Sequence, residues 1–180
     1  RICSSDSLRP YFNKFSEKAA NVFTWFDVKP IIVGGPALKI PAVEYAFKGD
    51  KWGIRKKISD YYSRQTNSKP VALMGGVAYP LDANSISGLT KAQQILLSIG
   101  LVLTFDIGDL EVAASREALG YDPRTQANIK SLLSTVLTDL SASFEKSMKA
   151  ATTEWEARQI FGKTFGSSGQ YSHEFFQIFR

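Results

Sequence analysis

The feature that most constrains the fold of this chain is one long amphipathic pattern in its second half. Asp122 followed by Pro123 is typical of a helix start, because Asp caps the first free N–H groups and Pro lacks one. Behind this start, apolar side chains recur at steps of three and four residues: Ile129, Leu132, Leu133, Val136, Leu137, Leu140, Phe144 and Met148. We therefore predict a helix from Pro123 to Met148 whose apolar stripe must be buried against another layer.

Short apolar segments before this helix predict that the other layer is a β-sheet. Residues 99–105 are rich in β-branched and aromatic side chains, which is typical of a central strand. Residues 70–82 predict two short strands, or one bent strand with Gly75 and Gly76 at the bend. Residues 54–62 fit either a strand or a helix. Weaker strand patterns are present in three further places: residues 31–33, 43–47 and 110–113.

Helical patterns flank the predicted sheet. Residues 7–26 place apolar side chains on one helical stripe: Phe12, Phe15, Ala19, Val22, Phe23 and Phe26. Residues 153–165 predict a further helix, and for the aromatic tail at 171–180 we favour core packing over a docking role. This order predicts an α+β fold, with a mixed sheet and helices packed on one face in residues 1–150. Residues 151–180 are expected to form a C-terminal helical extension.

Several kinds of chemistry are excluded or disfavoured by residue counts and missing motifs. One cysteine and one histidine cannot form a disulfide framework or a multi-histidine zinc site within one chain. Neither a P-loop nor a G-x-G-x-x-G loop is present. Asp106, Asp109 and Glu111 could hold a cation, but a solvated turn is favoured, so no metal site is expected.

The net charge of +5 permits an anionic partner, which leaves two alternative functions open. One alternative is a nucleic-acid-binding module whose patch mixes basic and aromatic residues: Lys51, Arg55, Lys56, Lys57 and Arg64 with Trp52, Tyr61 and Tyr62. The other is a purely structural interaction domain. No apolar run approaches the ~20 residues that a membrane-spanning helix needs.

A charged triplet, Ser115-Arg116-Glu117, is expected at the junction between a strand and the long helix. A guanidinium held there can present two parallel N–H donors to phosphate oxygens of a neighbouring domain. Alternatively, Arg116 pairs with Glu117 or Asp122 and ties down the helix start. From chemistry alone, the local ion pair is the favoured interpretation.

The stretch "GDLEVAASREALGYDPRTQANIKSLL", which starts at Gly108, resembles the end of the transducer region in GHKL ATPases (gyrase, Hsp-ninety, histidine kinase, MutL). Three blocks in order resemble the phage rapid-lysis rIIA-type proteins, which carry the same kind of ATPase module: residues 11–35, 72–82 and 108–129. The third block is the specific one. The resemblance covers roughly residues 8–145.

This resemblance implies a transducer-type fold related to one ribosomal-protein fold. It also implies an ATP-binding domain, with ATP and Mg, that precedes this chain in a longer protein. Arg116 would contact the terminal phosphate of ATP, Ser115 would orient the turn, and Glu117 would cap or brace the helix start. In gyrase and MutL relatives a lysine from a loop of the transducer makes the phosphate contact. Lys91 is a candidate counterpart of that lysine, as an alternative to Arg116.

The hallmark elements of the ATP-binding domain are missing from the sequence, so this chain alone is not expected to hydrolyse ATP. A start at Arg1 suggests a fragment. The resemblance further implies a role in lysis inhibition or host interaction, a homodimer and an rIIB-type partner protein. It places the parent protein in the cytoplasm of an infected bacterium, peripheral to the inner membrane.

Overall fold

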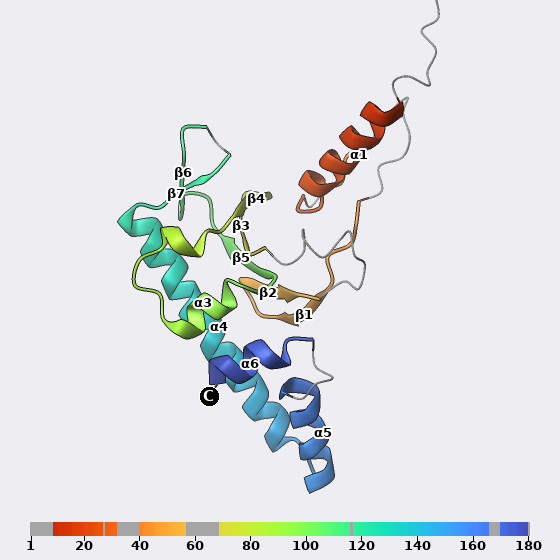
Figure 1. Cartoon of the computed structure of the whole chain (residues 1–180), viewed down its shortest axis with the longest axis vertical. Coiled ribbons are helices and arrows are strands. Elements are labelled where there is room, and N and C mark those ends of the chain that lie inside the picture. Colours follow the sequence, from red (N-terminus) through yellow and green to blue (C-terminus); the bar gives the residue numbers. More distant parts are fainter. Residues whose placement is uncertain are drawn as a thin grey trace, which may run out of the picture.

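The centre of the structure is a five-stranded mixed β-sheet (Figure 1). The computed structural model describes residues 9–26, 28–31, 40–56, 69–115, 117–165 and 170–179, without the side chains of residues 9–14 and 17. The strands are β1 (Tyr45–Lys48), β2 (Trp52–Arg55), β3 (Val71–Met74), β4 (Val77–Pro80) and β5 (Leu101–Phe105). Their order across the sheet is β1-β2-β5-β3-β4. Within this sheet, β3 and β5 are the one pair of neighbouring strands that runs parallel, and Ala72 lies opposite Leu103.

The central position predicted for residues 99–105 is confirmed, because β5 lies between β2 and β3. The two-strand interpretation of residues 70–82 is also confirmed, since β3 and β4 form a hairpin. Gly75 and Gly76 make its turn with φ angles of 59° and 80°. A two-residue turn with both φ angles positive matches the twist of the strands that it joins, and glycine adopts it without steric cost.

The predicted long helix is α4 (Pro123–Lys149), and it is confirmed from end to end. Asp122 is its N-cap, with a side chain that accepts a hydrogen bond from the Thr125 N–H. The side chains that face the sheet are completely buried: Ile129, Leu133, Val136 and Leu140. On the sheet side, Trp52 Nε1 donates to Asp139 Oδ2 over 2.8 Å, which fixes β2 against the middle of α4.

Three shorter helices complete this helical layer (Figure 1). They are α3 (Lys91–Leu96), α5 (Glu154–Phe165) and α6 (Ser172–Phe179); a 3-10 turn, η2 (Ala83–Ser85), precedes α3. Helix α6 packs against both α3 and α5, and α4 against both α3 and α5. The aromatic tail therefore belongs to the core, with Tyr171 and Phe175 buried, as favoured from the sequence. Residues before and after position 150 contribute to this core. The domain boundary expected at position 150 stays a prediction.

Helix α1 (Arg9–Phe23) departs from the predicted arrangement of helices on one face. Trp52 and Arg55 lie on opposite faces of β2, because side chains alternate along a strand. The segment directly after α1 meets the Arg55 face, where the guanidinium lies 5.7 Å from the centroid of the Trp25 ring. Helix α1 itself projects away from the sheet (Figure 1).

The helix predicted within residues 7–26 is confirmed as α1, but its apolar stripe is not buried as a whole. Phe15 is 63% exposed and Val22 is 56% exposed, whereas Ala20 is buried. The side chain of Phe12 lies outside the described residues. Most of the predicted strand at 31–33, together with residues 57–62 of the ambiguous segment, also lies outside them. Within the described helices, none is long and apolar enough to cross a membrane.

Candidate functional site

Ser115 and Glu117, the described members of the Ser-Arg-Glu triplet, lie at the tip of a small β-hairpin rather than directly at a helix start. Strands β6 (Glu111–Val112) and β7 (Leu119–Gly120) pair antiparallel and form a separate two-stranded sheet (Figure 1). Ser115 and Glu117 are exposed, and the Glu117 N–H donates to Ser115 Oγ over 3.4 Å. Arg116 lies outside the described residues. Ser115 and Glu117 thus lie on a turn that solvent, or another protein domain, can reach.

The base of this hairpin is hydrogen-bonded to the first turns of α4. The Glu111 N–H donates to Thr125 Oγ1 over 2.8 Å, and Asn128 Nδ2 donates to the Asp109 carbonyl over 2.7 Å. Thr125 is almost completely buried, so its hydroxyl bond is shielded from water. Buried polar pairs of this kind are costly to break, because each group would lose its partner without regaining water. The hairpin base and the start of α4 therefore form one tied unit.

The same unit is joined to the loop that follows β4. The Asp82 N–H donates to the Tyr121 hydroxyl over 2.8 Å, and the Ser87 N–H donates to Gln126 Oε1 over 3.0 Å. Gln126 in turn donates through Nε2 to the Tyr121 carbonyl over 2.7 Å. Burial raises the pKa of the Tyr121 hydroxyl above its ordinary value. Movement of the start of α4 would therefore strain the hydrogen bonds that join it to the loop after β4, and so to the main sheet.

The role predicted for Glu117 at the helix start is taken by Asp122. Hydrogen bonds from the side chain and then the backbone of Thr125 lower the pKa of the Asp122 carboxyl. Strand β7 separates Glu117 from this cap, which the sequence analysis did not foresee because a two-residue strand has no periodicity to detect. Glu117 therefore belongs to the turn.

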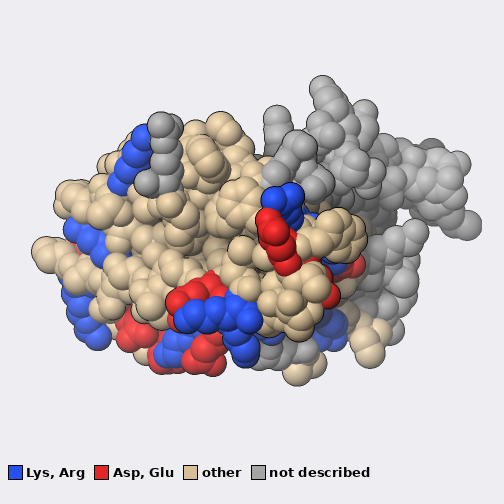
Figure 2. Space-filling model, turned by 90° about the horizontal axis from the view of Figure 1, so that it is seen from below, with Lys and Arg blue, Asp and Glu red and all other residues tan. Residues whose placement is uncertain are grey.

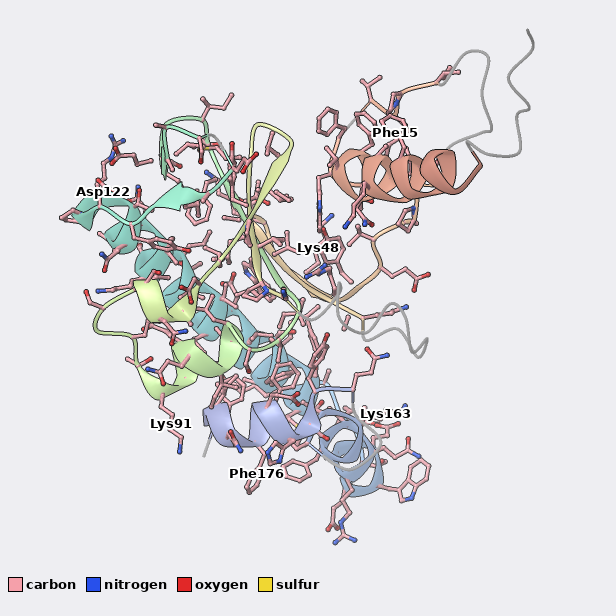
Figure 3. The ribbon with its side chains drawn as sticks, turned by 45° about the horizontal axis from the view of Figure 1, so that its top comes forward. Phe15, Lys48, Lys91, Asp122, Lys163 and Phe176 are labelled. Carbon is pink, nitrogen blue, oxygen red and sulfur yellow. The ribbon has the colours of Figure 1, made fainter. Side chains whose placement is uncertain are left out.

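Lys91 is not close to the hairpin tip. It is the first residue of α3, directly after the N-cap Thr90, and is exposed. Gln93 of the same helix donates to Ser134 Oγ over 3.2 Å, so α3 lies beside the third turn of α4. Figure 3 shows Lys91 well apart from Asp122, with the lysine side chain directed away from Asp122.

The described members of the basic and aromatic patch expected for nucleic-acid binding are either buried or paired with acidic side chains. Trp52 is only 6% exposed and Arg55 only 4% exposed, so neither can stack on a base or contact a phosphate. Lys51 pairs with Asp106, and Lys56 pairs with Glu44. The other four members lie outside the described residues: Lys57, Tyr61, Tyr62 and Arg64. On the face that Figure 2 presents, basic and acidic side chains lie next to each other rather than forming a basic patch.

The acidic turn after β5 is organised by hydrogen bonds within the protein. The Asp106 N–H donates to Asp109 Oδ2 over 3.1 Å, and Asp106 Oδ2 lies 2.6 Å from Lys51 Nζ. Glu111 lies in β6. In the described part of the chain, no group of three or more His, Cys, Asp or Glu side chains could hold a metal ion.

The sequence analysis missed one cluster, in which Trp25, Tyr45 and Arg55 meet on the sheet face away from α4. Arg55 Nε donates to the Gly100 carbonyl over 3.3 Å, its Nη2 donates to the Lys69 carbonyl, and its own carbonyl accepts from the Tyr171 hydroxyl. Burial raises the pKa of Tyr171 to about 12. These residues lie 10 to 116 positions from Arg55 in the sequence, so no local pattern could have linked them.

Comparison with protein-family models, curated proteins and solved structures finds no significant match to this chain. None of these comparisons therefore supports the resemblance of residues 108–129 to the transducer region of GHKL ATPases, which stays a prediction.

Proposed function

We propose that this chain is the transducer domain of a phage rIIA-like GHKL ATPase. In this proposal the ATP-binding domain belongs to the same longer protein, binds ATP with Mg, and presents the terminal phosphate to Arg116. One observation carries the proposal: an exposed hairpin tip leads through a hydrogen-bonded base directly into the longest helix of the protein.

The proposed coupling runs from the hairpin tip to the far end of α4. Ser115 supports the turn by accepting the hydrogen bond from the Glu117 N–H, and Arg116 between them supplies positive charge to the phosphate. A phosphate that pulls on the tip also pulls on Thr125 and Asn128, because both bind the hairpin base. With 27 residues, α4 is about 40 Å long, so a small tilt at its start becomes a larger displacement near α5.

ATP and Mg belong to the neighbouring domain in this proposal, because the sequence of this chain has neither phosphate-binding loop motif. When bound there, ATP supplies the phosphate whose presence or loss is sensed. Arg116 would also stabilise the negative charge that develops during hydrolysis, so this chain would complete the catalytic site without holding the nucleotide.

The proposed biological setting follows from the family resemblance alone. The parent protein would act in lysis inhibition or host interaction as a homodimer with an rIIB-type partner. It would work in the cytoplasm of the infected bacterium, peripheral to the inner membrane.

The test is ATP turnover by the longer protein that unites this chain with its ATP-binding domain. We expect Arg116→Ala to lower kcat by about a hundredfold or more with nucleotide affinity retained, because the contact acts mainly on the reacting phosphate. Arg124→Ala is the matched control: this exposed arginine of α4 lies close to the same hairpin, and its loss should leave turnover within about twofold.

A third variant, Lys91→Ala, separates the two candidate residues for the phosphate contact. Wild-type turnover in Arg116→Ala together with a large loss in Lys91→Ala would move the role to Lys91. Wild-type turnover in both variants would remove the catalytic part of the proposal.

A further inference from the structure

A cavity of about 570 Å³ lies on the sheet face away from α4. It is lined by Thr24, Trp25, Phe26 and Lys29, which follow α1, by the segment that leads into β1, and by strands β1 and β3. Its walls are mostly apolar and aromatic, which is typical of small-ligand sites of this volume. The principal wall residues are Trp25, Phe26, Ile40, Val43, Tyr45 and Leu73.

The walls of this cavity are held in place by contacts that do not need a ligand. Lys29 Nζ donates to the carbonyls of Phe23, Thr24 and Phe26 over 3.0, 2.8 and 2.7 Å, which closes the C-terminal end of α1. The guanidinium of Arg55 lies against the Trp25 ring and is itself bound to two main-chain carbonyls. A pre-formed site loses less conformational entropy when it binds a ligand.

The charges around the cavity are positive. Lys29 lines it, Lys48 Nζ lies 5.7 Å from the centroid of the Tyr45 ring, and Arg55 is close enough to act on the titration of Tyr45. Among the described residues that line the cavity, none is acidic. The neighbouring Glu44 is bound to Lys56 at 2.9 Å.

The polar group best suited to meet a ligand is the Tyr45 hydroxyl. Tyr45 is half-buried among the lining residues, and its hydroxyl can donate a hydrogen bond to a ligand. Its ring lies directly over Gly53, where an added Cβ would come within 2.5 Å of the ring. The hydroxyl is therefore fixed in position by the packing of its own ring.

We infer that this cavity binds a small aromatic acid. The ring of the ligand packs among Trp25, Phe26 and Leu73, and its carboxylate accepts a hydrogen bond from Tyr45 near the ammonium of Lys48. Lys29 and Arg55 add long-range attraction, because their N–H groups are already bound to carbonyls. This site does not depend on the proposed ATPase function and lies on the opposite sheet face from α4.

Isothermal titration calorimetry with 2-naphthoate and its neutral analogue 2-naphthylmethanol tests the inference. We expect the acid to bind about tenfold more tightly than the alcohol, since a hydrogen bond to a charged group is stronger than one between neutral groups. Tyr45→Phe should abolish most of this preference. Tyr79→Phe, the same change at a buried core tyrosine, should retain it.

A second pair of variants tests the location of the site. Val43→Trp fills the cavity and should abolish naphthoate binding, whereas Val77→Trp, the same change at a partly exposed position of β4, should not. If the circular dichroism spectrum shows that Val43→Trp does not fold, the acid-over-alcohol preference of Tyr45→Phe, compared with that of Tyr79→Phe, decides instead. Absence of naphthoate binding at millimolar concentration, equal affinity for acid and alcohol, or binding unchanged in a folded Val43→Trp variant would each overturn the inference.

Discussion

At the residue scale, two glycines illustrate how the backbone angle decides what a side chain would cost. Gly75 has a φ angle of 59° in the β3–β4 turn, a region that side-chain-bearing residues rarely adopt. Gly162 lies within α5, and an added Cβ there would meet nothing within 4 Å. The same substitution should therefore have opposite effects at the two positions.

We expect Gly75→Ala to destabilise the fold by about 1 kcal/mol, because alanine is strained at positive φ. Gly162→Ala should stabilise it by about 0.5–1 kcal/mol, since alanine loses less backbone entropy in a helix. Urea unfolding measures both free energies. Gly75→Asn is the control at the turn, because asparagine tolerates positive φ and should cost less than alanine. Equal effects of alanine at both positions would contradict the assigned turn.

At the element scale, the start of α4 combines a local sequence signal with a tertiary role. Asp122 and Pro123 were sufficient to predict where the helix begins. Its neighbour α3 was not predicted because its six residues show too little periodicity, although Thr90 and Gln93 form a capping box that could have indicated it. Helix starts in this protein are thus encoded by caps more clearly than by hydrophobic periodicity.

The Asp122 cap should make stability depend on pH. Its pKa is lowered in the folded state, so it contributes stability above the ordinary value of 3.8, and that contribution is lost as the pH falls through the folded value. We expect Asp122→Ala to lower Tm by a few degrees at pH 7 and by less at pH 3. Asp122→Asn keeps a capping side chain without the charge, so its Tm should exceed that of Asp122→Ala at pH 7. A constant Tm difference between wild type and Asp122→Ala from pH 7 to pH 3 would contradict this role.

At the scale of the whole molecule, the C-terminal helix closes the core between segments far apart in sequence. Phe175 packs edge-on against Phe47 of β1 and Phe144 of α4, with ring centroids 5.2 and 5.4 Å apart. The Tyr171 hydroxyl donates to the Arg55 carbonyl across 116 residues. The sheet and the helical layer are therefore held together partly by the last residues of the structure.

Two adjacent phenylalanines test this closure. Phe175 is 1% exposed and Phe176 is 51% exposed. We expect Phe175→Ala to cost about 3–5 kcal/mol in the free energy of unfolding, because it leaves a cavity in the core, and Phe176→Ala to cost well under 1 kcal/mol. Chemical denaturation followed by circular dichroism measures both. Similar costs for the two variants would show that α6 does not pack as described.

The sequence by itself determined the elements whose signals are local: α4 with its cap, the β3–β4 hairpin with its two glycines, and the central strand β5. It also drew attention to Ser115, Arg116 and Glu117 through a resemblance that the described fold neither contradicts nor tests. Short elements such as β7 and α3 escaped, because two to six residues hold too little periodicity to be distinguished from a loop.

Only the tertiary structure decided which face each residue occupies and which distant residues meet. Trp52 and Arg55 look like surface recognition residues in sequence, yet both are buried, Trp52 against α4 and Arg55 against Trp25 in the segment after α1. The same packing gathers Trp25, Tyr45 and Leu73 around one cavity. The physical reason is that secondary structure is set by neighbours in the chain, whereas burial and sites are set by contacts between elements that the chain brings together only when it folds.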